Sequence, residues 1–346
     1  MKADAWKLRF YLPMQSISPA LWAGLLTMTD IYSQQKRNRR LTVILIAAFF
    51  IILAILGLAI DSYTFGTLET TGLPVATIIA ISLASVNGFV AYFYGDSVVL
   101  FSLRAQPIQF ENPLHKKLHN VVTEMALASG LPMPKIYVIP DPAPNAFATG
   151  RDPRHAVVGV TEGLLENMNR EELQAVIAHE MGHIKNQDIL LMTVVTVLVG
   201  TIVLLSDWAV RAWKYGGIRT RRSSRSKGMH PLILLIIVLF ALLAPLLSRI
   251  IAMAVSRQRE YLADASSAEF TRNPAALANA LEKIGKASSP ISTAHKGTAH
   301  LFISDPLHRG LDNKEGLVAD VLSTHPPIEK RIERLRRMAY SYGGKV

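Results

Sequence analysis

The chain has 346 residues, of which half are hydrophobic, and its formal net charge at pH 7 is +11. Its mean hydropathy is positive, which is unusual for a soluble protein and indicates that part of the chain lies in a membrane. There is no cysteine, so disulfides, cysteine nucleophiles and thiolate metal sites are excluded.

The positive charge of the chain gathers beside its apolar runs. Lys36, Arg37, Arg39 and Arg40 immediately precede the first run. This placement suits anionic lipid headgroups, and no nucleic-acid recognition motif accompanies it. We therefore expect the lipid bilayer, and no nucleic acid, as a partner.

Residues 1–40 form an N-terminal extension before the first apolar run. They mix aromatic residues, leucine and proline, and they lack the arrangement of a cleavable signal peptide. An extension that is interfacial or partly ordered fits this composition, and so does a floppy tail.

Two uninterrupted apolar runs predict two transmembrane helices within residues 41–94. They extend from about Leu41 to Ile60 and from about Pro74 to Tyr94, each long enough to cross a bilayer at about 1.5 Å per residue. The connector between them has no Lys or Arg, and basic residues follow the second run. The positive-inside rule then predicts a multi-pass protein of the plasma (inner) membrane, with the N-terminus and the following domain in the cytoplasm.

Residues 189–247 contain two further apolar runs, about 189–206 and about 231–247, which predict a hairpin. The loop between them, residues 207–230, carries seven Lys or Arg residues, so a hairpin that crosses the membrane would export a very basic loop. Whether the hairpin crosses or only dips into the membrane stays open.

Residues 95–188 and 248–346 are more polar, and we expect them to join into one domain. The first part predicts a helix after Asn112, short β-rich runs near 135–139, 146–149 and 155–160, and a second helix after Asn169, where Glu172 completes a capping box. The expected fold class is therefore a mainly α integral membrane protein. Its transmembrane helices join an α+β domain with a small β-sheet.

The second predicted helix carries the motif His179-Glu180-Met181-Gly182-His183. Two histidines four residues apart project from one face of a helix and can bind one tetrahedral ion. Glu180 lies one residue further round, where it can reach a water on the metal, which is the place of a general base. Such a pentapeptide also arises by chance, but the capped helix around it argues against chance.

A hydrolytic zinc site needs a third protein ligand, which without cysteine must be Asp, Glu or His. Glu260 and Asp264 lie four residues apart on the helix predicted after the fourth apolar run. Glu260 suits ligation, and Asp264 suits a hydrogen bond to a ligand histidine; a solvated helix face beside Arg257 and Arg259 is the alternative. Because an antiparallel hairpin returns to its starting side, the site should lie near the membrane surface.

Four separated blocks resemble the HtpX-type membrane metalloproteases, relatives of the CAAX-prenyl endopeptidase group. They are the segment 145–150, the H-E-M-G-H helix, the segment 257–264, and Thr324-His325-Pro326-Pro327 running into Arg331. The resemblance implies a zincin-like metalloprotease domain with one Zn²⁺ held by His179, His183 and Glu260. It also implies that Glu180 polarises the attacking water and that Asp264 orients a ligand histidine.

The resemblance also implies residues that meet the substrate. His325 and Arg331 would donate to the oxyanion of the tetrahedral intermediate. An edge strand would pair with an extended substrate by β-addition, and its residues would be Asn145, Ala146, Phe147 and Ala148. A simple turn at Asn145 and a mere helix start at His325 are the alternatives.

Together these features predict a membrane-embedded zinc endopeptidase. The family implies misfolded or damaged membrane proteins and unfolded polypeptides as substrates, in membrane-protein quality control and the stress response. The alternatives are a prenyl-protein endopeptidase, which would need a larger chamber, and a non-catalytic membrane scaffold stabilised by zinc. A transporter is disfavoured because the apolar runs contain almost no ionisable residues. The oligomeric state is not specified by the sequence.

Overall fold

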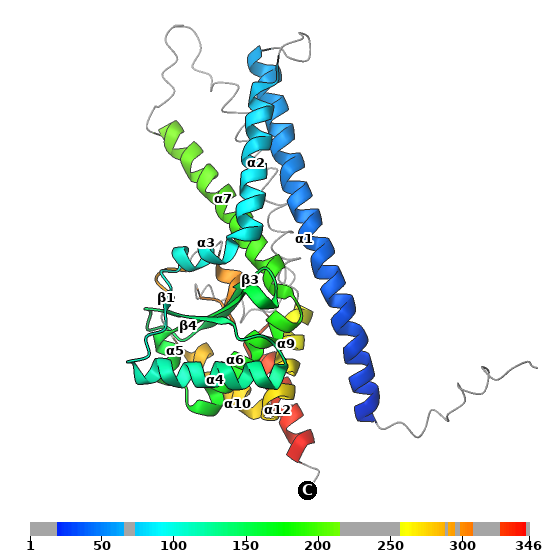
Figure 1. Cartoon of the computed structure of the whole chain (residues 1–346), viewed down its shortest axis with the longest axis vertical. Coiled ribbons are helices and arrows are strands. Elements are labelled where there is room, and N and C mark those ends of the chain that lie inside the picture. Colours follow the sequence, from blue (N-terminus) through cyan, green and yellow to red (C-terminus); the bar gives the residue numbers. More distant parts are fainter. Residues whose placement is uncertain are drawn as a thin grey trace, which may run out of the picture.

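The computed structural model is mainly helical and has two parts. Two long helices, α2 and α7, extend to one side of a domain that contains a small sheet and the other helices, and the longer α1 continues past α2 to the level of that domain (Figure 1). This arrangement confirms the predicted fold class. The structure describes residues 19–65, 73–214, 257–287, 290–294, 298–306 and 326–343.

The helices α1 (Pro19–Phe65) and α2 (Val75–Phe93) pack side by side. Within them, Gln35–Ile55 and Val75–Phe93 have mean hydropathies of 2.0 and 1.8 and are long enough to cross a membrane. These stretches overlap the two predicted spans. The helix α1 begins at Pro19, inside the range expected to be an extension, and residues 1–18 lie outside the described part of the chain.

The side chain of Asp61 on α1 accepts hydrogen bonds from the first residues of α2. Its carboxylate accepts hydrogen bonds from the amides of Ala76 and Thr77, both at 2.8 Å, and from the Thr77 hydroxyl at 2.7 Å. A carboxylate at a helix N-terminus satisfies amides that have no partner within the helix. One turn earlier, a Cβ on Gly57 would lie 2.4 Å from the Thr77 Cα, so only glycine permits this close helix contact.

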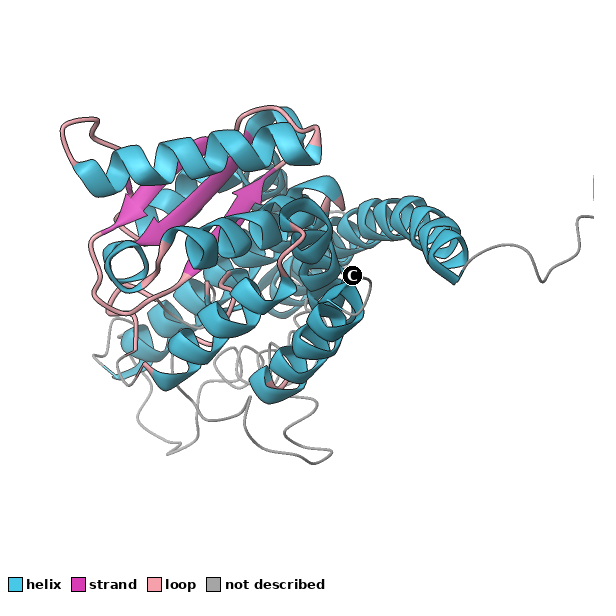
Figure 2. Cartoon of the chain, turned by 90° about the horizontal axis from the view of Figure 1, so that it is seen from below, coloured by secondary structure: helices cyan, strands magenta, loops and turns pink. Residues whose placement is uncertain are grey.

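The sheet has four strands in the order β1-β2-β4-β3. Strands β2 and β4 are parallel, whereas β3 is antiparallel to β4 and forms an edge of the sheet. Helices pack beside the strands (Figure 2), and one buried apolar cluster joins the sheet to α4, α6 and α10. The strands are β1 (Gln106–Pro107), β2 (Lys135–Ile139), β3 (Ala146–Gly150) and β4 (Ala156–Thr161).

Two of the domain's helices, α4 and α6, begin at the predicted start signals. The helix α4 begins after Asn112, whose side chain accepts from the Leu114 amide at 2.9 Å, and it ends at Gly130 in a left-handed conformation. The remaining helices are α3 (Gly95–Ser102), α4 (Pro113–Ser129), α5 (Glu162–Asn167), α6 (Arg170–Lys185), α9 (Arg257–Thr271), α10 (Pro274–Lys286) and α12 (Ile328–Gly343), with short 3₁₀ turns at Pro153–His155 and Ala299–Leu301.

The helix α7 (Asp188–Lys214) leaves the domain directly after α6. The axes of α6 and the first part of α7 meet at 86°. Gln187, at the break, has a φ of 57°. The third predicted apolar run, 189–206, therefore lies in α7. The fourth run, 231–247, and most of the basic loop 207–230 lie outside the described residues.

Candidate metal centre

The helix α6 is fixed at its start by the predicted capping box. The Asn169 side chain accepts from the Glu172 amide, and the Glu172 side chain accepts from the Asn169 amide, both at 2.9 Å. Downstream of this cap the helix runs through the core, so the H-E-M-G-H residues are buried. The cap sets where α6 begins, and thereby which residues face the sheet and which face α9.

Three side chains from two helices converge at this site. His179 and His183 come from α6 and Glu260 from α9, and their ligand atoms all lie within 4.8 Å of one another. The two Nε2 atoms are 3.2 Å apart, and each lies 3.7 Å from an oxygen of Glu260. Donors of a tetrahedral zinc site, with bonds of about 2.0–2.1 Å, lie roughly 3.3 Å apart. The three donors therefore fit one metal ion.

Each histidine has a carboxylate behind it. The Nδ1 atom of His179 lies 3.0 Å from Asp264, and the Nδ1 atom of His183 lies 3.1 Å from Asp188. A carboxylate at Nδ1 fixes the ring orientation and directs the lone pair of Nε2 at the metal. Asp264 was predicted for this place, whereas Asp188 was missed. The sequence offered one signal for Asp188: a carboxylate five residues after His183, just past the end of the helix, can reach back to that histidine.

The pKa values of the two histidines are shifted in opposite directions. Burial lowers the pKa of His179 to about 4, although Asp264 acts in the opposite direction. Burial also disfavours protonated His183, but the hydrogen bond to Asp188 and the charge of Glu260 raise its pKa to about 9. An ion that binds here at neutral pH therefore displaces a proton from His183, and its affinity falls as the pH falls.

Arg331, on α12, is buried against the ligand cluster. Its Nε and Nη2 donate to the two oxygens of Asp264 at 2.9 and 2.7 Å, and Nη1 donates to the carbonyl of Ile303 at 2.8 Å. Nη1 also lies 3.4 Å from Glu260. Although burial raises the pKa of Asp264, the charge of Arg331 holds it below its usual value. Arg331 thus supports the carboxylate behind His179.

Glu180 lies next to His179 on α6 and is 1% exposed. Its charge adds to the environment that raises the pKa of His183. The predicted site residues on α6 and α9 and Arg331 are therefore brought together. His325 lies outside the described residues, and its role, like the oxyanion role of Arg331, stays a prediction.

Gly182, inside the motif, lets α6 and α9 approach closely. A Cβ at this position would lie 3.0 Å from the Ser266 Cβ and 3.2 Å from the Ala263 Cα. Nearby, the Ser267 hydroxyl donates to the Ala175 carbonyl of α6 at 2.7 Å. This contact brings Glu260 of α9 within reach of the two histidines.

Replacing Gly182 by valine is expected to push α9 away from α6. We expect overpacking to lower the free energy of unfolding by about 1–3 kcal/mol and to weaken metal binding. Thermal unfolding with and without added zinc measures both effects. Gly200→Val is the matched control, because among the described residues a Cβ on Gly200 meets no atom of another element within 4 Å. Equal unfolding temperatures and equal zinc shifts for the two variants would contradict this packing argument.

Comparison with known proteins agrees with the arrangement of these residues. A family model described as "Peptidase family M48" matches residues 113–339. The chain belongs to peptidase family M48. The matched residues include the whole ligand cluster and Arg331, so the family resemblance read from the sequence is confirmed.

Two relatives within this family match nearly end to end. A protease HtpX homolog of Caldanaerobacter subterraneus subsp. tengcongensis is 45% identical over 315 residues, covering 90% of this chain and 99% of the relative. One from Thermoanaerobacter pseudethanolicus is 44% identical over 308 residues, covering 89% and 98%. A solved structure, Ste24p of S. mikatae, matches with a TM-score of 0.48 and 18% identity, covering 88% of this chain and 67% of that one.

In this M48 peptidase, the predicted substrate-binding segment 145–148 lies at the edge of the sheet. The side chains of Asn145, Ala146, Phe147 and Ala148 are all buried. The outer edge of β3 is partly engaged, because Ile303 donates its amide to the Ala146 carbonyl at 3.0 Å. At the other end of β3, Gly150 donates to the Thr193 hydroxyl at 3.1 Å.

The backbone of Ala148 lies between these two engaged positions. The backbone of Asn145 faces β4, because the amide of Thr161, the last residue of β4, donates to the Asn145 carbonyl at 3.0 Å. Strand backbones alternate, so Ala146, Ala148 and Gly150 present their amides and carbonyls to the outer side. Phe147 also forms an antiparallel bridge with Phe302, so the segment 302–303 already lies along the outer edge of β3 next to Ala148.

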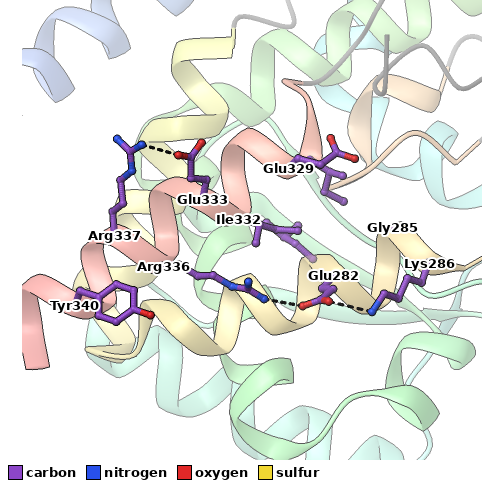
Figure 3. A pocket seen from close by; sticks show the side chains of 11 residues that line it. Glu282, Gly285, Lys286, Glu329, Ile332, Glu333, Arg336, Arg337 and Tyr340 are labelled. Carbon is purple, nitrogen blue, oxygen red and sulfur yellow. Dashed lines mark hydrogen bonds and ion pairs between the residues drawn. The ribbon is translucent and has the colours of Figure 1, made fainter. Parts of the chain in front are cut away.

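A separate hollow of about 530 Å³ lies between α10 and α12. Ile332 lines it, and Glu282 of α10 binds Arg336 of α12 at 2.8 Å and Lys286 of its own helix at 2.9 Å (Figure 3). None of the candidate metal ligands lines this hollow. It therefore belongs to the packing of α12 and not to the metal centre.

Proposed function

We propose that this chain is a membrane-embedded zinc endopeptidase. The observation that carries the proposal is the buried convergence of His179, His183 and Glu260 on one point in a member of family M48. Two imidazoles and one carboxylate are a donor set that suits catalytic zinc, in which water takes the fourth position. One Zn²⁺ per chain is proposed.

The residues around the ion divide the chemistry of peptide hydrolysis. A bound zinc ion supplies Lewis acidity to the attacking water and the peptide carbonyl. The Glu180 carboxylate takes the proton from the water and passes it to the leaving amine. Asp264 and Asp188 hold the ligand rings in place, and His325 with Arg331 is proposed to stabilise the oxyanion.

An extended substrate is proposed to pair with β3 through Ala148. The outward amide and carbonyl of this residue would supply the hydrogen bonds of β-addition, next to the bridge that Phe147 forms with Phe302. The sequence between Asn145 and Ala148 then acts through its backbone and needs no direct side-chain contact with the substrate.

Replacing Ala148 by proline removes its outward amide. Proline is tolerated on an edge strand when its nitrogen faces away from the partner strand. We expect kcat/KM for peptide cleavage to fall about tenfold, as the loss of one hydrogen bond predicts, with zinc content unchanged. Ala148→Ser, which keeps the amide, is the control and should retain activity. A proline variant with the activity of the serine variant would exclude pairing at this position.

The position of the site supports membrane-bound substrates. The ligand helix α6 is followed at once by α7, which extends beside α1 and α2 (Figure 1). We propose that the enzyme faces the cytoplasm and cuts misfolded or damaged membrane proteins in membrane-protein quality control. The two apolar spans and the likeness to protease HtpX homologs support this proposal.

The test uses the full-length chain reconstituted in lipid vesicles. An unfolded membrane protein without a prenyl group and a prenylated CAAX peptide serve as alternative substrates. We expect cleavage of the unprenylated protein, loss of cleavage with a zinc chelator, and recovery when zinc is returned. Cleavage of the prenylated peptide alone would favour a prenyl-protein endopeptidase, and cleavage of neither by the zinc-loaded protein would favour a scaffold.

A further inference from the structure

The turn between α6 and α7 is held by the first membrane helix. Gln35 of α1 donates to the Lys185 carbonyl at 2.8 Å, and Arg39 donates to the Gln187 side chain at 2.9 Å. Asn38 and Arg39 lie three and four positions after Gln35, and all three side chains meet this turn. The family match begins only at residue 113, so this contact comes from outside the matched peptidase region.

Asn38 connects α1 to the metal centre through Asp188. Its Nδ2 donates to one oxygen of Asp188 at 2.5 Å, and the other oxygen of Asp188 lies 3.1 Å from Nδ1 of His183. Asn38 is 1% exposed and Asp188 is 0% exposed. The two oxygens of one buried carboxylate are thus divided between the membrane helix and the metal-binding histidine.

The side-chain oxygen of Asn38 accepts a hydrogen bond from a residue of α9. Arg259 donates from Nη1 to the Asn38 Oδ1 at 3.2 Å, and its Nε lies 3.9 Å from Asp188. Arg259 directly precedes Glu260 on α9. Asn38 therefore contacts Asp188, which lies behind the ligand His183, and Arg259, which precedes the ligand Glu260.

We propose that Asn38 is a positioning residue for the metal ligand His183, so that the first membrane helix sets the metal affinity of the site. The proposal rests on the metal site proposed above. With one oxygen held by Asn38, the Asp188 carboxylate cannot rotate away, and its second oxygen keeps the His183 ring in the tautomer that turns Nε2 to the metal. Without Asn38, this buried oxygen of Asp188 loses its hydrogen-bond donor and, among the described residues, keeps only Arg259 at 3.9 Å, so the carboxylate turns to recover a hydrogen bond.

The test measures zinc affinity of the purified full-length chain by competition with a chromogenic chelator. Asn38→Ala is expected to bind zinc about 10–100-fold more weakly than the wild type. Asn38→Asp keeps the side-chain size but replaces the donated bond with a repulsion, so a similar or larger loss is expected. Gln35→Ala is the matched control, because it removes a contact between α1 and the same turn without touching Asp188.

A second measurement separates an effect on the position of His183 from a general loosening of α1 against the turn between α6 and α7. The visible absorption of the cobalt-substituted protein reports ligand geometry, and we expect it to shift in Asn38→Ala and to stay unchanged in Gln35→Ala. Wild-type zinc affinity in both Asn38 variants, or equal losses in Asn38→Ala and Gln35→Ala, would overturn the proposal. His183→Ala keeps the two proposals distinguishable. If it binds zinc as tightly as the wild type, the metal site itself is wrong.

Discussion

Replacing Glu180 by glutamine is expected to lower the rate of peptide hydrolysis about a hundredfold to ten-thousandfold, the usual contribution of a general base. Glutamine has the same shape, but it cannot accept a proton from the attacking water. Glu180 is not one of the three converging ligands, so the variant should keep its zinc. Single-turnover cleavage of an unfolded membrane protein, with bound zinc measured on the same sample, checks both expectations.

The matched control for this prediction is Glu166→Gln. Glu166 is an exposed carboxylate on α5, and its replacement should change neither cleavage nor zinc content. If Glu180→Gln keeps full activity, another group accepts the proton. If it loses its zinc as well as its activity, Glu180 acts in metal binding and not as the base.

Replacing Arg331 by methionine is expected to destabilise the domain strongly. The substitution leaves Asp264 and Glu260 buried without the cation that Asp264 binds at 2.7 and 2.9 Å. Removing one partner of a buried ion pair costs about 3–5 kcal/mol. We therefore expect a large drop in the unfolding temperature and weaker zinc binding, because Asp264 no longer holds the His179 ring. Thermal unfolding and chelator competition measure these two effects.

A double variant separates this structural role of Arg331 from its predicted oxyanion role. If Arg331 acts chiefly by neutralising Asp264, then adding Asp264→Asn to Arg331→Met should recover part of the lost stability. Arg337→Met, at an exposed position, is the control. A stable Arg331→Met protein with normal zinc affinity and a selectively lower kcat would instead favour direct oxyanion stabilisation.

The parts of the site that the sequence predicted are those encoded by local spacing. His179 and His183 lie one turn apart, as do Glu260 and Asp264, so helix geometry alone puts each pair on one face. The capping box at Asn169 was likewise readable, because both partners lie within four residues. Joining the two helices required the resemblance and the hairpin argument, since no local pattern specifies that α9 packs on α6.

The parts that were missed depend on contacts between distant residues. Asn38 and Asp188 are 150 positions apart, and in the sequence each is only a polar residue beside an apolar run. Asp61 was assigned to the connector by its charge, yet it lies in α1 and binds the start of α2. The carbonyl of Ala146, on the edge strand, pairs with the amide of Ile303, and no periodicity in the sequence predicts this long-range contact.

X-ray absorption of the purified full-length chain at the zinc edge tests the central claim most directly. The account predicts about one zinc per chain, bound only by nitrogen and oxygen at roughly 2.0–2.1 Å, with the scattering pattern of two imidazoles. It also predicts that the zinc is lost in Glu260→Ala and retained in Glu180→Gln. A folded, zinc-free wild-type chain, or an unchanged spectrum after Glu260→Ala, would contradict it.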